Sequence, residues 1–91
     1  MDRTRAKATL RDIARFKTIG LSKHCRNRMA ERNVSMEDIV HVLMWGTITD
    51  IETVDPGRWR CTVTGEDLDG DALVLVAALD AANEAACITV Y

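Results

Sequence analysis

The stretch that decides the fold spans residues 21–46 and reads LSKHCRNRMAERNVSMEDIVHVLMWG. It predicts two successive helices. The first runs from about Ser22 to Arg32, because Ser22 is a suitable N-cap. Asn33 follows, and asparagine readily takes the left-handed conformation that closes a helix.

Ser35 begins the second helix of this stretch. Acidic residues follow at positions 37 and 38, in a first turn where the helix dipole favours negative charge. Gly46 is expected to end the helix. Its apolar face is formed by side chains at helical spacing, namely Met36, Ile39, Val40 and Leu43.

A stripe of cationic or titratable side chains marks the first of these helices. His24, Arg28 and Arg32 recur at a spacing of four, which places them along one side of the helix. Cys25 and Met29 form the neighbouring apolar stripe. Like charges four residues apart repel by a few tenths of a kcal/mol, so the stripe indicates an anionic partner that offsets the repulsion.

An earlier helix is predicted over residues 4–18, with Gly20 ending it. Its arginines and lysine lie away from an apolar set that recurs at helical spacing, Ala6, Leu10, Ile13 and Ala14. This helix either covers the core or joins a second copy of the chain.

From Thr47 the pattern changes to that of strands. The first is expected over 47–54 and is followed by a turn at 55–57, where proline fixes φ and glycine permits positive φ. Trp59, Cys61 and Val63 then alternate with polar residues, as in a half-buried strand. The third strand follows a turn at Asp69-Gly70; it is continuously apolar over 72–79 and should be buried on both faces.

The last strand is expected over 85–91, after a turn at 80–84. Short turns between four consecutive strands give an antiparallel meander. The fold class is therefore α+β, with the N-terminal helices packed on one face of a four-stranded antiparallel meander sheet, in the order ααα-ββββ.

Charge divides the chain. Residues 1–46 carry ten Lys/Arg and five Asp/Glu, whereas residues 47–91 carry two and nine, so the net charge of −2 combines a basic half with an acidic one. The basic half could face phosphates, or the two signs could simply be solvated faces. Three widely spaced cysteines predict reduced, buried thiols. With neither a membrane-length apolar run nor a secretory signal pattern, we expect a cytoplasmic protein.

The polar positions at fixed spacing resemble a known family. The pattern S-x-H-A-x-x-R-M-x-E-R-x-I-S-x-x-D-I…G is that of the domain of unknown function 4258, and this chain resembles it from Ser22 to Gly46, with Ile88–Tyr91 similar to the final strand. Cys25 stands where alanine is usual, and Asn33 where glycine is common. The resemblance covers about 21–91, leaving 1–20 as an N-terminal helical extension of a single α+β domain.

The resemblance implies a fold similar to RelE-like bacterial ribonuclease toxins, whose members act as partners of small antitoxin proteins. RNA can be cut without metal when its 2′-hydroxyl attacks the adjacent phosphate, given a proton-transfer group and cations for the developing charge. His24 is a suitable proton-transfer group, and Arg28 and Arg32 suit phosphate binding. Arg60, on the polar side of a strand, and Tyr91, at the end of another, could complete the cleft.

Each of these residues also has a structural interpretation. His24 could bond to the sheet, and Arg28 and Arg32 could pair with Glu31 or with acids of the strand half. Arg60 could be a solvated strand residue, and Tyr91 could serve packing. His41 is expected to be exposed.

Other apparent motifs are set aside. Residues 67–71 resemble the start of a calcium loop, but its glycine is misplaced and Ala78 occupies the position of the bidentate glutamate, so a hairpin turn is predicted. The histidines and cysteines lack zinc-ligand spacing, and no cofactor or metal is expected. Trp45 and Trp59 are expected to pack in the core.

Three functions remain open from the sequence. The first is a toxin-like, metal-independent ribonuclease, with RNA and an antitoxin protein as partners. The second is a binding module without catalysis, for nucleic acid or protein. The third is a structural homodimer or higher oligomer joined through residues 1–20. None of them involves a membrane.

Overall fold

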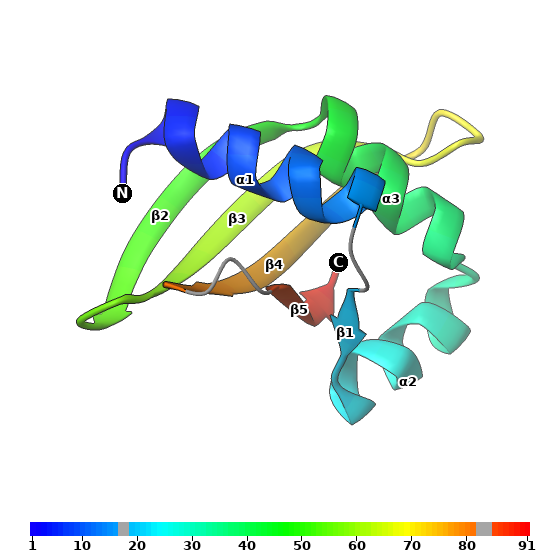
Figure 1. Cartoon of the computed structure of the whole chain (residues 1–91). Helices are drawn as coiled ribbons and strands as arrows, with labels where there is room; N and C mark the ends of the chain where they lie inside the picture. The colour runs from blue at the N-terminus through cyan, green and yellow to red at the C-terminus, as the bar shows by residue number, and fades with distance from the viewer. Residues whose placement is uncertain (17–18, 82–84) are drawn as a thin grey trace.

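The computed structural model describes residues 1–16, 19–81 and 85–91, except for the side chains at 85–88. Three helices and a sheet make up the chain (Figure 1). The elements are α1 (Arg3–Phe16), β1 (Gly20–Leu21), α2 (Lys23–Arg32), α3 (Met36–Trp45), β2 (Thr47–Asp55), β3 (Arg58–Glu66), β4 (Ala72–Asp80) and β5 (Ala85–Val90). The predicted α+β class and the antiparallel meander of β2 to β5 are confirmed.

The sheet has the order β1-β5-β4-β3-β2, so one strand was missed. β1 is only two residues long and pairs in parallel with β5, Gly20 opposite Ala86 and Leu21 opposite Cys87. Two residues carry no alternation, and this pattern therefore could not predict the strand. Gly20, expected to end the first helix, lies in β1 instead, and α1 ends at Phe16 among the described residues. Residues 17 and 18 of the predicted helix lie outside the described chain.

The signals that end and begin helices acted as expected. Ser22 caps α2 by accepting the Cys25 N–H, and Asn33 closes it at φ 56°. Ser35 caps α3 within a full capping box: its hydroxyl accepts the Asp38 N–H, and the Asp38 carboxylate accepts the Ser35 N–H. Gly46 ends α3 by donating to the Val42 carbonyl at 2.7 Å.

α1 and α3 lie side by side across one face of the sheet, while α2 lies beside the β1 edge (Figure 1). The core between them is built from apolar side chains of both layers. From α1 it takes Ala6, Leu10 and Ile13, and from α3 it takes Ile39, Val42 and Leu43. The apolar face of α1 is therefore buried within its own chain, which is one of the two roles expected for this helix.

β4 corrects a prediction. It was expected to be buried on both faces, but only Leu73, Leu75, Ala77 and Leu79 are buried, and the residues between them are half-buried. The helices cover one face, so the opposite side of a central strand meets solvent even where it is apolar. β3 alternates as predicted, with Cys61 and Val63 buried.

Candidate functional site

The end of β5 and the start of α2 form the site to which the sequence pointed. The β5 residues alternate, so Val90 faces the core and Thr89 faces the opposite side of the sheet. Thr89 is nevertheless only 6% exposed. The Nε2 atom of His24 lies 3.3 Å from its hydroxyl, so the imidazole reaches β5 and remains exposed itself. The structural alternative for His24, a bond to the sheet, is thus present.

Tyr91 joins this group through strand pairing. Its N–H donates to the Val74 carbonyl at 2.8 Å, and its own carbonyl accepts from the Val74 N–H. Residues two apart in extended chain point the same way, so Tyr91 lies on the same face of the sheet as Thr89. Its side chain is 51% exposed rather than packed away. An imidazole and a phenol therefore border one solvent-facing strip.

Arg28 contacts the end of β5 at the strand edge that faces away from β4. Its Nε donates to the Val90 carbonyl at 3.3 Å, and its guanidinium pairs with Glu31 at 3.4 Å. β1 pairs with β5 only as far as residue 87, so the edge beyond it is accessible to a side chain of α2. The Glu31 carboxylate is 62% exposed, and an exposed pair of this kind contributes less than about 1 kcal/mol. A phosphate could replace it.

Arg32 lies one turn further along α2 and is exposed. It has no ion-pair partner among residues 1–16, 19–81 and 85–91. α2 buries Cys25 alone, and residues 23–32 carry four Lys/Arg and one Glu. The helix therefore exposes a basic surface beside His24.

Arg60 does not join these residues. It lies on β3 opposite Ala78, and β4 separates it from β5. Strands are about 4.8 Å apart, and Arg60 is also displaced along the strands from Thr89, so the two Cα atoms are roughly 12 Å apart. Its guanidinium pairs with Glu52 at 3.6 Å. The five predicted residues thus divide into a group around α2 and a separate arginine.

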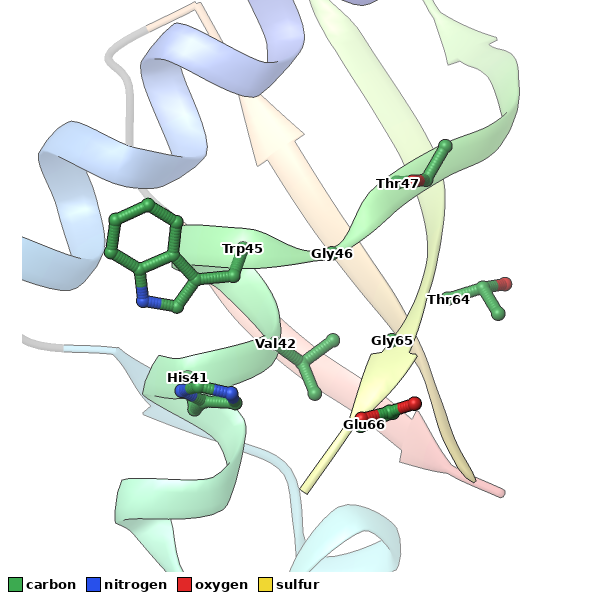
Figure 2. Close-up of a pocket in the computed structure, with 8 residues that line it drawn as sticks. All are labelled: His41, Val42, Trp45, Gly46, Thr47, Thr64, Gly65 and Glu66. Carbon is green, nitrogen blue, oxygen red and sulfur yellow. The ribbon is translucent and has the colours of Figure 1, made fainter. Parts of the chain in front are cut away.

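The structure also shows two adjoining hollows that the sequence reasoning missed. The first, of about 470 Å³, is lined by Met36, Glu37, Val40, His41, Met44, Trp45 and Leu68. The second, of about 220 Å³, is a notch where α3 meets the start of β2 (Figure 2); it is lined by His41, Val42, Trp45, Gly46, Thr47, Thr64, Gly65 and Glu66. None of the five predicted residues lines either hollow.

Trp45 corrects the expectation that both tryptophans pack in the core. Its side chain is 67% exposed, whereas Trp59 packs partly buried against the core. His41 is half-buried rather than exposed. A signal was available, since Met36, Val40 and Met44 recur every four residues on a helix that already has a core face.

Two buried side chains, those of Asp38 and Cys61, have shifted pKa values. Hydrogen bonds from the backbone N–H groups of Ser35 and Leu68 lower the pKa of the Asp38 carboxyl. Burial raises the pKa of the Cys61 thiol, which favours its neutral form. Cys25 is buried as predicted, while the side chain of Cys87 lies outside the described residues.

The predicted hairpin turn at 67–71 is confirmed. The Asp67 carboxylate accepts the N–H groups of Asp69 and Asp71, each at 2.9 Å, and Gly70 takes φ +88°. The carboxylate that would begin a calcium loop is thus turned toward its own backbone. Among the described residues, no group of three His, Cys, Asp or Glu side chains is placed to hold a metal ion.

These features define a small α+β protein with a basic helix at one edge of an antiparallel sheet. The model of the domain of unknown function DUF4258 matches residues 21–91, and the chain belongs to this family. Comparison with curated proteins and with solved structures finds no match. No helix in the described parts of the chain is long and apolar enough to cross a membrane.

Proposed function

We propose that this protein acts on RNA as a metal-independent ribonuclease of the toxin type. One observation carries the proposal: His24, from a basic and exposed helix, contacts Thr89 beside the exposed Tyr91. Histidine transfers protons near neutral pH, and Arg28 and Arg32 follow His24 by one and two helical turns on the same helix, which supports the proposal. The likeness to RelE-like toxins inferred from the motif points to the same chemistry.

In the proposed reaction the RNA supplies its own nucleophile. His24 takes the proton of a 2′-hydroxyl, whose oxygen attacks the adjacent phosphorus and displaces the 5′-oxygen of the next nucleotide. The imidazolium so formed returns the proton to that leaving oxygen. The products are a 2′,3′-cyclic phosphate and a 5′-hydroxyl. Arg28, one helical turn from His24, binds the phosphate and offsets the negative charge of the transition state. Arg32, two turns and thus about 12 Å along the helix axis from His24, binds a neighbouring phosphate of the RNA.

Arg60 has a different role in this scheme. It lies two strand spacings from Thr89 with an offset along the strands, and its guanidinium pairs with Glu52 on β2, the neighbouring strand on the side away from β5. It would bind a neighbouring phosphate of the same RNA chain once its exposed pair with Glu52 is exchanged. Arg60 would then support affinity, while His24 supports the chemical step.

The test is cleavage of labelled RNA, both free and ribosome-bound, in the presence of EDTA. The wild type should produce 2′,3′-cyclic phosphate ends, and substrates lacking the 2′-hydroxyl should resist. His24→Ala should abolish cleavage and retain the fold, with His41→Ala, the other histidine, as the matched control. Arg60→Gln should weaken the binding of RNA more than it slows the cleavage of RNA that is already bound. If the wild type cuts neither form of RNA, the ribonuclease proposal fails.

A second candidate is an RNA-binding module without catalysis. The ion pair between Arg60 and Glu52, on the far side of β4 from β5, favours this alternative. Affinity would then fall steeply with salt while no product forms. Arg28→Gln and Arg32→Gln should each reduce the salt slope by about one, and Arg58→Gln, at the far end of β3, should not.

A toxin of this type would be held inactive by an antitoxin protein, and co-purification from cells that express both would test that partner. The homodimer through residues 1–20 is also a proposal. Because α1 buries Ala6, Leu10 and Ile13 in its own core, such a dimer would use the outer side of the helix, where Phe16 is 74% exposed. Light scattering of Phe16→Ser would test it.

A further inference from the structure

α3 is apolar on two sides. One side, Ile39, Val42 and Leu43, is buried in the core. A second stripe, Met36, Val40 and Met44, recurs every four residues and faces outward beside Trp45. No element among the described residues covers this second stripe fully, since Met36 is 37% exposed and Trp45 is 67% exposed.

The hairpin turn between β3 and β4 completes a groove along this stripe. Leu68 projects from the turn, is 60% exposed, and lines the groove opposite α3. The Leu68 N–H donates to the Asp38 carboxylate at 2.9 Å, so the turn is fixed to the start of α3. The groove is therefore a built feature with two walls. At the other end of α3 it adjoins the notch of Figure 2, which is lined by His41 and Trp45 of α3 and by Thr64 and Glu66 of β3.

The rim of the groove is acidic. Glu37 lines the groove itself and Glu66 lines the notch. The turn that carries Leu68 also contains Asp67, Asp69 and Asp71, which add negative charge nearby without lining either hollow. The cation at this end is Arg11, whose guanidinium lies 5.8 Å from the Trp45 ring centroid and whose Nε donates to the Met44 carbonyl at 2.8 Å. An apolar floor with a mostly negative rim calls for an apolar and basic ligand.

We propose that this groove is the docking site for a basic amphipathic helix of a partner protein. The apolar side of such a helix would cover Met36, Val40, Met44 and Leu68, as amphipathic helices do in apolar grooves. Methionine is flexible and polarisable, which lets the surface adapt to different apolar side chains. Lysine and arginine on the helix would contact the acidic rim, and one guanidinium could enter the notch between Trp45 and Glu66.

The alternatives fit this surface less well. Nucleic acid would meet the carboxylates of the rim with like charge. A second copy of the chain offers α1 and α2 as its basic helices, but α1 buries its apolar face and α2 has a single buried residue and no apolar face to offer. The proposal is also independent of RNA cleavage, because none of the groove residues belongs to the site around His24.

The methionines allow a direct test by NMR of protein labelled with ¹³C at the methionine methyl groups. Of the four methionines, Met36 and Met44 line the groove, while Met1 and Met29 pack elsewhere against the core. The probe is a synthetic helix of leucine and lysine, about 18 residues and thus roughly 27 Å long. Its counterpart has glutamate in place of lysine. The lysine peptide should shift Met36 and Met44 and leave Met1 and Met29 unchanged, and the glutamate peptide should not bind.

Two variants sharpen the result. Leu68→Lys places a cation in the groove wall and should lower the affinity for the lysine peptide by about tenfold or more. Val54→Lys, at another exposed apolar position on β2, is the matched control and should leave binding unchanged. The proposal is overturned if neither peptide binds, if both bind equally, or if all four methionines shift alike. It is equally overturned if Met36 and Met44 shift with protein concentration alone, which would make a second copy the occupant.

Discussion

The Asp38 carboxylate is the point at which the α3 cap and the β3–β4 turn are joined, and its removal should cost this small protein much of its stability. One oxygen accepts the Ser35 N–H at 2.9 Å and the Ser35 hydroxyl at 3.0 Å. The other oxygen accepts the Leu68 N–H at 2.9 Å. The residue is only 8% exposed, so water cannot readily replace these bonds.

The cost of Asp38→Ala follows from these contacts. Loss of the capping interaction is worth about 1 kcal/mol. Loss of a hydrogen bond to a charged acceptor is worth about 1.5–3 kcal/mol, and the Leu68 bond is in this class. The free energy of unfolding should therefore fall by about 3 kcal/mol, out of a total of about 5–15 kcal/mol. For a domain of this size the Tm should fall by about 12–24 °C.

The same contacts predict how the effect changes with pH. They lower the pKa of Asp38 in the folded protein, so the unfolded chain, with a pKa of about 3.9, takes up the proton first as the pH falls. The stabilisation by the carboxylate is complete well above that pH and is lost as the pH falls through the lower, folded pKa. Asp38→Asn should therefore be destabilised relative to the wild type at neutral pH, by a margin that narrows in acid.

Urea unfolding followed by far-UV circular dichroism, at steps from neutral pH to about pH 2, measures this margin. Asp69→Asn is the matched control, because it is an exposed carboxylate of the same turn and should give a small difference at every pH. A margin for Asp38→Asn that stays constant over the whole range would refute the reasoning, since the ionised carboxylate would then contribute nothing through these bonds.

Two further predictions concern packing. Gly46→Ala should destabilise by about 1–3 kcal/mol or more, because the new Cβ would lie 2.6 Å from the Val42 carbonyl oxygen. Gly70→Ala has open space, so only the strain of φ +88° should appear, as a smaller loss in the same urea titration. Leu10→Ala should lower the free energy of unfolding by about 2–5 kcal/mol although α1 lies outside the family match. Thr4→Ala, at an exposed position of the same helix, should lower it by almost nothing. Equal Tm values for the two variants would show that α1 is dispensable to the core.

The sequence predicted those parts of the fold that depend on local chemistry. Ser22, Asn33, Ser35 and Gly46 each specify a helix end by hydrogen bonding or backbone conformation within a few residues, and all four act as expected. Much of the meander was predictable for the same reason, since the turns before β3 and before β4 carry Gly57 and Gly70 at positive φ and the strands carry alternation or a continuous apolar run.

The remaining features depend on contacts between distant segments. β1 exists only because β5, some 65 residues later, offers an edge to Gly20 and Leu21. The half-exposed side of β4 follows from the packing of α1 and α3 against the opposite face of the sheet. In the candidate site, helical spacing predicted that His24, Arg28 and Arg32 share α2. It could not predict that His24 contacts Thr89, two residues before Tyr91, while Arg60 lies two strands away.

The position of Arg60 bears on whether binding of RNA and cleavage of RNA would use the same residues, a question that the sequence left open. Had Arg60 lain within contact of His24, one phosphate could meet the guanidinium groups of Arg28 and Arg60 together with an imidazole, an arrangement suited to charge developing at a single centre. Instead β4 lies between them, and Val76 and Ala78 form a half-buried apolar strip across which an RNA chain would have to extend. Nucleotides on this strip would bind through phosphates at both borders. If RNA is cleaved as proposed, His24→Ala should lower the rate of cleavage, whereas Arg60→Gln should lower the affinity for RNA.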